Sequence, residues 1–381
     1  MRRPIPYLRL GIFYFCYFAS LGAILPYWGL YLQTQGLTPK EIGIVLAGLA
    51  ATKVIAPNLL GWLADLSGRR VAWVRLACFL AATWFLLVFR VSGYWGLLWV
   101  SLAFGVFWSA ALSQFEALTL AHLGVAAGCY SWIRLWGSVG FILAVLGLGV
   151  GIDWLGIVLL PQALAALLWL IWLSVQLVPE SEEVTVAVSC PGSWRQVLRQ
   201  GPVLAFLLVV FLVQVAHAPY YAFYSIYLEQ SGYSGLTTGV LWSLGVAAEI
   251  ALFLGFPFLL RWAALRSLWL SALALGALRW LAIGFGVRRL EILVVAQLLH
   301  AATFAVNHAV AMQLVQSYFS APHQGKGQAL YSSLSFGLGG MVGSFLAGAW
   351  WQTAGAQWVY GVAAAINVLA LLVAWLGVKP R

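Results

Sequence analysis

Long apolar stretches with few charged residues recur from one end of this chain to the other. A helix needs about 20 apolar residues to cross a bilayer, and a short connector brings that unit to roughly 30 residues. The 381 residues therefore hold about twelve such units. Only 8% of the residues are charged, against roughly 25% in soluble proteins, so the chain cannot cover itself with a hydrated surface. We expect an all-α membrane protein whose main solvent is the lipid bilayer.

The apolar segments divide into two sets of six around one long connector. We expect helices at about 7–32, 40–64, 71–90, 94–122, 131–151, 155–177, 203–228, 237–260, 267–286, 290–318, 327–350 and 356–377. The connector 178–202 carries three glutamates, then Pro191, Gly192 and two arginines, which is typical of a hinge outside the membrane. The sequence thus predicts a six-helix N-terminal half at 1–177 and a six-helix C-terminal half at 203–381.

A short internal repeat relates these two halves. Four identities recur at a constant offset of 196 residues, where Tyr31, Leu32, Gly36 and Gly43 match Tyr227, Leu228, Gly232 and Gly239. The match covers the end of helix 1 and the start of helix 2, against helices 7 and 8. Its placement favours a duplicated half, as in many secondary transporters.

Lysine and arginine are unequally divided between the two sets of connectors. With the N-terminus inside, four of them lie on the outer side, namely Lys40, Arg90, Arg288 and Arg289. Thirteen lie on the cytoplasmic side: Arg2, Arg3, Arg9, Arg69, Arg70, Arg75, Arg195, Arg199, Arg261, Arg266, Lys326, Lys379 and Arg381. The positive-inside rule then predicts cytoplasmic termini for a multi-pass protein, which we expect in a bacterial cytoplasmic (inner) membrane.

The connector after the second helix carries a motif that runs from Gly61 to Arg70 as GWLADLSGRR. The glycines Gly61 and Gly68 allow a tight turn and a close helix approach, and Asp65 can meet basic groups. Arg69 and Arg70 anchor the loop at the cytoplasmic face. The motif resembles the loop signature of the major facilitator superfamily, which implies a gating loop. The second half has Leu259 where this aspartate would stand, so any such gate is asymmetric.

A more specific resemblance lies in helix 5, which reads YSWIRLWGSVGF from Tyr130 to Phe141, with Glu116 eighteen residues before Arg134. It resembles the major facilitator branch of the 3-phenylpropionate transporters, the lactose permease and the nucleoside:proton symporters. In these families an arginine follows a helix-4 glutamate by eighteen residues, and in the lactose permease both contact the substrate. The resemblance implies two six-helix halves, alternating access driven by a proton gradient, and substrate contact through Glu116 and Arg134.

Five charged residues lie within the expected spans, where each costs about 2.5–3.5 kcal/mol unless it has a partner or a wet cavity: Lys53, Glu116, Arg134, Glu249 and Arg279. Arg134 can offer a planar fork to a carboxylate or to paired hydroxyls. Glu116 either orients that fork or is displaced by an anionic substrate, and the alternative is a pair that only locks the helices together. Lys53 and Glu249 are again 196 residues apart, which makes both candidates to face a shared cavity and to pair there, or simply to pack.

For the second half, the resemblance to the lactose permease implies proton coupling by a helix-8 glutamate, a helix-9 arginine and a polar helix-10 cluster. The matching residues are Glu249, Arg279 and, on helix 10, His300, Asn307 and His308, which the spacing places on one face. The acidic residue of helix 10, Glu291, lies at its outer end and not within it, so the permease site is not reproduced residue by residue. Glu249 is the first candidate for the proton carrier and His308 the second. His217 is interpreted as a helix–helix hydrogen-bond donor.

Aromatic residues recur at near-helical spacing on the two helices that line the cavity in this fold, namely Tyr14, Tyr17 and Trp28 on helix 1 and Tyr221 and Tyr224 on helix 7. Their rings can stack an aromatic ring or a sugar face, or can serve packing alone. The substrate set is therefore Glu116, Arg134, Tyr17, Tyr221 and Asn307.

Together these features predict a secondary transporter, most simply a proton-coupled symporter for a small organic solute such as an aromatic carboxylate. A sugar or nucleoside:proton symporter and a proton-driven efflux transporter remain alternatives. An enzyme is not expected, because the only aspartates are Asp65 and Asp153 and no HExxH motif occurs. We expect a monomer whose partners are a small-molecule substrate, protons and the bilayer, with no nucleic acid, no metal and no cofactor.

Overall fold

A computed structural model describes residues 5–124, 129–180, 194–319 and 323–378, which are almost entirely helical. Twelve helices in this described part are long and apolar enough to cross a membrane, so the expected number of spans is confirmed. The hinge residues Pro191 and Gly192 and the termini lie outside the described residues.

The chain separates into two compact units. Unit 1 consists of residues 1–186 and 233–240, and unit 2 of residues 187–232 and 241–381. The helices that begin before residue 180 are α1 (Tyr7–Thr34), α2 (Pro39–Ser67), α3 (Arg70–Phe85), the 3-10 turn η1 (Leu86–Phe89), α4 (Gly93–Leu123), α5 (Tyr130–Leu155) and α6 (Leu159–Gln176).

The remaining elements are α7 (Trp194–Leu198), α8 (Gly201–Gln230), α9 (Gly235–Trp262), α10 (Leu265–Gly286), α11 (Leu290–Leu298), η3 (Ala301–Val306), α12 (Asn307–Tyr318), α13 (Gln324–Ser332), η5 (Ser333–Gly339), α14 (Gly340–Ala354) and α15 (Ala356–Gly377). Two of the expected helices are not uniform α-helices, since η3 and η5 are π-helical segments within the spans 290–318 and 324–354. Such segments are often found at functional sites.

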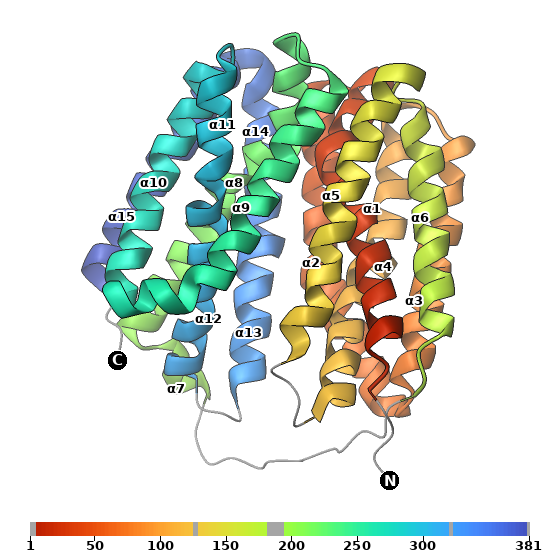
Figure 1. Cartoon of the computed structure of the whole chain (residues 1–381), viewed down its shortest axis with the longest axis horizontal. Coiled ribbons are helices and arrows are strands. Elements are labelled where there is room, and N and C mark those ends of the chain that lie inside the picture. Colours follow the sequence, from red (N-terminus) through yellow and green to blue (C-terminus); the bar gives the residue numbers. More distant parts are fainter. Residues whose placement is uncertain (1–4, 125–128, 181–193, 320–322, 379–381) are drawn as a thin grey trace. The chain divides into compact units, whose positions relative to one another are not determined.

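In unit 1, α1 packs against α5 and α6, while α4 packs against α2 and α3 (Figure 1). Glycines allow α1 and α5 to approach closely. A Cβ atom on Gly22 would lie 2.8 Å from the carbonyl oxygen of Phe141, and a Cβ on Gly140 would collide with the carbonyl of Phe15. The small residues thus set the helix separation, as is usual where lipid supplies no hydrophobic driving force.

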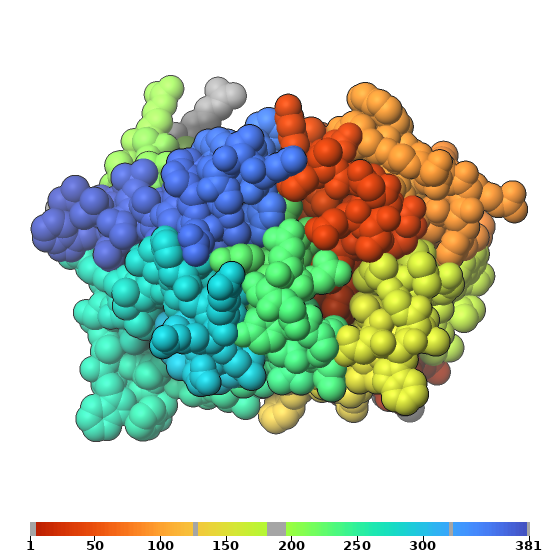
Figure 2. Space-filling view, turned by 90° about the horizontal axis from the view of Figure 1, so that it is seen from above, coloured from red at the N-terminus to blue at the C-terminus, as the bar shows by residue number. Residues whose placement is uncertain are grey.

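In unit 2, α8 packs against α14, α15 and η5, and α15 also packs against α10. Figure 2 shows the side chains of α15, in the darkest blue, bordering the cyan-green segment that includes α10. An apolar core centred on Phe206, Trp269 and Tyr331 fills the space between these helices.

The beginning of α9 belongs to unit 1 and is held by α5. Both carboxylate oxygens of Asp153 accept backbone N–H groups there, at 2.6 Å from Gly235 and 2.8 Å from Leu236. The first N–H groups of a helix lack partners within the helix, so this carboxylate acts as a cap. Gly149 permits the approach, since its Cβ would lie 2.5 Å from the carbonyl oxygen of Gly235.

Candidate functional site

Arg134 on α5 lies flat against an aromatic residue of α1. Its guanidinium carbon is 3.5 Å from the ring centre of Phe18 and 5.8 Å from that of Tyr14. The side chain is half-buried and so keeps part of its surface accessible. A cation on an aromatic face is stabilised by the ring quadrupole, and more strongly so where water is scarce.

Glu116 on α4 lies near Arg134 but does not form an ion pair with it. The hydroxyl of Tyr130 donates to the Glu116 carboxylate at 3.4 Å, and the charge of Arg134 acts on that carboxylate from farther away. Tyr130 stands one helical turn before Arg134 on the same side of α5, so it can bridge the two charges. The structure therefore brings Glu116 and Arg134 into one neighbourhood without pairing them directly.

The helix-5 motif explains this geometry residue by residue. Gly137 stands beneath the side chain of Arg134, and a Cβ there would lie 2.7 Å from Arg134 Nη1 and 2.8 Å from Phe18 Cδ2. Trp136 packs over Gly11 of α1, where a Cβ would lie 3.0 Å from the indole ring. The glycines thus serve two purposes, since Gly140 brings the helices together and Gly137 makes room for the guanidinium.

Two tyrosines of α1 adjoin this site but are fully packed. Tyr14 donates to Thr119 Oγ1 at 3.2 Å, and Tyr17 donates to the carbonyl oxygen of Trp108 at 3.1 Å while its ring stacks on that indole. Tyr17 is only 2% exposed. In this conformation its ring faces are occupied by protein, and a role in substrate binding stays a prediction.

Lys53 on α2 is half-buried and forms no hydrogen bond or ion pair with another described residue. It belongs to unit 1, whereas Glu249 belongs to unit 2. Their pairing stays a prediction.

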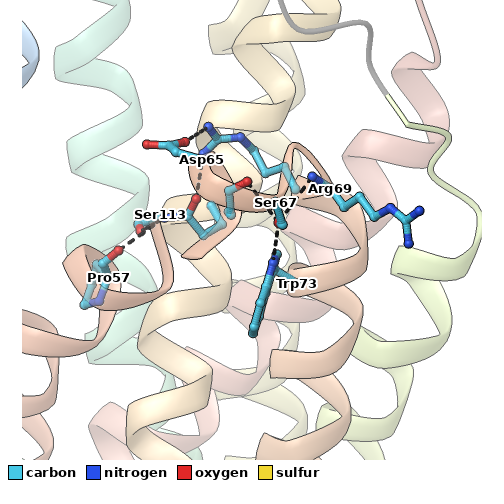
Figure 3. A network of polar contacts seen from close by, with 9 residues as sticks. Pro57, Asp65, Ser67, Arg69, Trp73 and Ser113 are labelled. Atoms are coloured by element: carbon cyan, nitrogen blue, oxygen red, sulfur yellow. Dashed lines mark hydrogen bonds and ion pairs between the residues drawn. The ribbon is translucent and has the colours of Figure 1, made fainter. Parts of the chain in front are cut away.

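The loop motif after α2 forms a polar network that ties three helices together (Figure 3). Arg70 at the start of α3 contacts Asp65 Oδ1 at 2.6 Å and donates to Gln114 Oε1 of α4 at 2.6 Å. Gln114 Nε2 in turn donates to the carbonyl oxygen of Pro57 at 3.2 Å. Gly61 leaves space for this amide, since a Cβ there would lie 2.9 Å from Gln114 Nε2.

Two further features complete the motif. Gly68 ends α2 with a φ of 63°, a left-handed conformation that glycine adopts without strain. Trp73 donates from Nε1 to Ser67 Oγ at 2.7 Å, while the side chain of Arg69 points away from the network (Figure 3). Of the five residues of the predicted gating loop, Arg70 and Asp65 are joined by an ion pair, Gly61 and Gly68 shape the backbone around them, and the side chain of Arg69 lies outside the network. The gating role itself stays a prediction.

In unit 2, Arg279 of α10 is completely buried. Its Nε donates to the carbonyl oxygen of Ala296 and its Nη1 to Thr303 Oγ1, both at 2.9 Å. The guanidinium carbon also lies 4.4 Å from the ring centre of Tyr220 and 4.7 Å from that of Trp280. Neutral oxygens and aromatic faces, rather than a carboxylate, surround this cation within the described residues.

Glu249 of α9 lies near the imidazole of His300. Its Oε2 is 3.8 Å from His300 Nε2, and the carboxylate side chain is 20% exposed. His300, Phe304 and His308 form a ladder of stacked rings along one helix face, with centres 5.5 and 6.2 Å apart. His300 and His308 thus share a face, as their spacing predicts.

Asn307 is turned toward α10, where its Oδ1 accepts from Trp269 Nε1 at 2.7 Å. Its Nδ2 donates to the carbonyl oxygen of Thr303, within η3. His308 Nδ1 lies 3.0 Å from the hydroxyl of Tyr331. Tyr221 is half-buried, with its ring 6.1 Å from that of His217. The expected second-half residues therefore surround α10, η3 and α12 without forming a single cluster.

Several residues that complete these sites are absent from the predicted site residues: Phe18, Gln114, Tyr130, Thr303, Tyr220 and Gln297. The hydroxyl of Tyr220 donates to Gln297 Oε1 at 2.9 Å. Tyr130 carries a recognisable signal, because it precedes Arg134 by four residues on one helix. Gln297 and Thr303 are polar residues within a span, which is also a signal, since such groups need a partner inside the protein. Phe18 carries none, because nothing distinguishes it from other aromatic residues of α1.

These arrangements can hold a polar or anionic solute and can accept or release a proton. Within the described ranges, no group of three His, Cys, Asp or Glu side chains converges on one point.

Comparison with known proteins places this chain among transporters. The model of the MFS_1 like family matches residues 7–362. A probable 3-phenylpropionic acid transporter of Escherichia coli is 33% identical over 358 residues, which are 87% of this chain and 87% of that protein. A maltose permease of Geobacillus stearothermophilus is 26% identical over 379 residues, or 95% of this chain and 92% of the permease. The crystal structure of the nucleoside transporter NupG matches with a TM-score of 0.80 at 19% identity, covering 97% of this chain and 98% of that one.

Proposed function

We propose, from the premise that the chain belongs to the MFS_1 like family of transporters, that it is a proton-coupled symporter for a small aromatic carboxylate. Its family and its relatives are transporters and not enzymes, and the chain is a multi-pass membrane protein. What is proposed is the substrate class and the coupling ion.

The observation that carries the substrate class is the setting of Arg134. A guanidinium is planar with an edge of N–H donors, and here its carbon lies 3.5 Å from the ring centre of Phe18. The edge remains for a planar carboxylate, which it can bind with two parallel hydrogen bonds. The half-buried Tyr130, whose ring centre lies 6.3 Å from that of the buried Tyr14, supplies aromatic surface for the rest of the solute.

The separation between the Glu116 carboxylate and Arg134 supports this proposal. Because the two side chains do not form an ion pair, an incoming carboxylate does not have to break one. Tyr130 can hold Glu116 aside while the substrate occupies the donor edge of Arg134. The likeness to a 3-phenylpropionic acid transporter supports the same substrate class.

A sugar or nucleoside is the second candidate, and the observation that favours it is Glu116 itself. A glutamate beside an arginine presents both acceptors and donors to paired hydroxyl groups. The likeness to a maltose permease supports this alternative.

Proton coupling is proposed to use Glu249 with His300 in unit 2. A carboxylate within an apolar span loses its proton at high cost unless water or a cation is near. His300, at 3.8 Å, is a neighbour whose own charge state can follow that of Glu249.

Uptake into proteoliposomes tests the proposal. Radiolabelled 3-phenylpropionate, maltose and uridine are offered separately, with and without an inward proton gradient. We expect accumulation of 3-phenylpropionate only, and only with the gradient. Accumulation of maltose or uridine instead would reject the aromatic carboxylate, and gradient-independent uptake would reject proton coupling.

The variant Arg134→Lys sharpens this test. Lysine keeps the charge but loses the planar fork, so we expect substrate affinity to fall at least about tenfold. The exposed Arg288 on the outer side provides the control substitution, Arg288→Lys, which should leave affinity unchanged. Normal transport by Arg134→Lys would make Arg134 a structural charge.

A further inference from the structure

Unit 2 contains a small cavity whose wall does not include Arg134, Glu116, Glu249 or His300, the residues of the proposed binding and coupling sites. It measures about 30 Å³ and lies where α8, α10, α12 and α13 meet the π-helical segments η3 and η5. The polar residues on its wall include His217, Thr303, Asn307, His308, Tyr331 and Ser335. The volume leaves room for about two water molecules.

Two buried polar atoms on the wall lack a protein hydrogen bond of normal length. Neither His217 Nε2 nor Ser335 Oγ forms one with another described residue, although the hydroxyl of Tyr331 lies near Ser335 Oγ. The two side chains are 2% and 3% exposed, so bulk water does not reach them. Buried polar atoms of folded proteins are nearly always hydrogen-bonded, which points to an unseen partner inside the cavity.

The position of the proton on the His217 ring determines whether that partner has to donate or accept a hydrogen bond. Its Nδ1 lies 2.8 Å from the carbonyl oxygen of Val213 and has to carry the proton of that hydrogen bond. In the neutral ring, Nε2 is then a bare acceptor that needs a donor. Ser335 Oγ can both donate and accept, so the occupant has to be able to donate at least once.

The charge around the cavity excludes ions. Arg279 donates to Thr303 Oγ1 on the cavity wall, so its positive charge repels a metal cation. The lone pair of His217 Nε2 repels an anion from the other side. A neutral molecule that fits the cavity and carries both hydrogen-bond donors and acceptors can bond to the polar atoms of the wall without being repelled by either charge.

We propose that this cavity is a binding site for about two ordered water molecules, one of which donates to His217 Nε2 and bonds to Ser335 Oγ. The water adds a hydrogen-bonded link between α8 and η5, which also pack directly on each other. Water-mediated hydrogen bonds can be exchanged for one another at little enthalpic loss, so helices joined in this way can shift without breaking their packing.

The π-helical segments η3 and η5 relate this site to the movement of helices. Both η3 and η5 contribute residues to the cavity, through Thr303 and Ser335. A π-turn disturbs the regular ladder of backbone bonds, and in η3 the side chain of Asn307 takes up the carbonyl of Thr303. The segments η3 and η5 therefore move relative to their neighbours at the hydrated cavity during transport. This inference rests on the proposed transport function but not on the coupling ion.

An experimental structure at a resolution that reveals water provides the first test. We expect water within hydrogen-bond distance of His217 Nε2 in the wild-type protein and in Ser335→Ala, and none in Ser335→Val, whose extra methyl groups fill the cavity. If the structure of the wild-type protein shows no water in this cavity, that result alone contradicts the proposal.

Transport kinetics provide the second test, with Ser335→Ala as the matched control. Ser335→Val should keep its substrate affinity and lose about tenfold in the rate of substrate exchange, because η3 and η5 then move less easily, whereas Ser335→Ala should stay within about twofold of the wild type. Equal exchange rates for all three proteins would show that the hydrated cavity does not assist the movement of η3 and η5. The variant Glu249→Gln separates the two proposals, since uphill uptake by that variant would reject coupling through Glu249 and leave the water site untouched.

Discussion

Gly137 determines where the guanidinium of Arg134 can lie. No other residue type fits beneath that side chain, because a Cβ would stand 2.7 Å from Arg134 Nη1 and 2.8 Å from the ring of Phe18. The far end of an arginine moves easily, whereas Phe18 is packed inside α1. A methyl group at this position therefore displaces the guanidinium readily, and it also presses on the ring of Phe18, which has less room to move.

This reasoning predicts that Gly137→Ala weakens substrate binding about tenfold while the protein still folds. Gly147 on the same helix offers a matched control, because a Cβ there would meet no atom within 4 Å. Affinity is measured by isothermal titration in detergent, and folding by thermal unfolding. Equal affinities for Gly137→Ala and Gly147→Ala would show that the position of the Arg134 side chain does not matter for binding.

The two intramembrane arginines differ in what they can still bind. Arg134 is half-buried, with an edge of donors that protein groups do not fill, whereas Arg279 is completely buried between a carbonyl, a hydroxyl and two aromatic rings and leaves only its Nη2 without a partner among the described residues. A buried charge without its partners is costly, so these neighbours hold Arg279 in place. Of the two, Arg134 is the better placed to meet a solute.

At the scale of helices, the loop motif joins α2, α3 and α4. Arg70 reaches from α3 to Asp65 of α2 and to Gln114 of α4, while the neighbouring Arg69 has its side chain in solvent. The pair with Asp65 is exposed and contributes little. The bond to Gln114 matters more, because that amide is 5% exposed and would otherwise lose the partner of its oxygen.

We therefore expect Arg70→Ala to lower the free energy of unfolding by about 1–3 kcal/mol, the cost of an unsatisfied buried polar group. Arg69→Ala, which removes the same charge one residue away, should lower it by less than about 0.5 kcal/mol. Thermal unfolding of both variants in one detergent measures the difference. Equal stabilities would mean that the positive charge of the loop, and not its hydrogen bonds, stabilises the contact between these helices.

The sequence predicts these helices well because membrane spans depend on length and hydrophobicity, both of which are visible in it. The expected and observed ends differ by a few residues, as between 94–122 and Gly93–Leu123. The π-helical segments η3 and η5 could not be predicted, since residues such as Thr303 and Ser335 suit an α-helix equally well. The resemblance to known transporters implied that Glu116 and Arg134 lie near each other, but the intervening Tyr130 and the supporting Phe18 depend on side-chain packing that periodicity does not encode.

At the scale of the whole molecule, the distribution of lysine and arginine predicts the orientation in the membrane. Reporter fusions after Arg381 and within the 178–202 connector should both report the cytoplasm, because the basic residues concentrate on that side. A fusion at 288–289, between α10 and α11, should report the outside and serves as the control. An outside signal from either of the first two would reverse the assigned orientation.

Coupling between solute and proton is also a property of the whole molecule, and Glu249→Gln isolates it. Glutamine resembles the protonated carboxylate in shape and charge, so the variant should bind substrate and exchange it across the membrane at near wild-type rates. It should fail to accumulate substrate against a gradient, because no proton can be released. His300 lies 3.8 Å from the carboxylate and retains a polar neighbour in the variant, so folding should not suffer. Both quantities are measured in the same proteoliposomes, exchange with labelled substrate on one side and accumulation under a proton gradient. Uphill uptake by Glu249→Gln would remove this residue from the mechanism and direct attention to His308 and Glu116, whereas loss of exchange as well would assign Glu249 to substrate binding or helix packing.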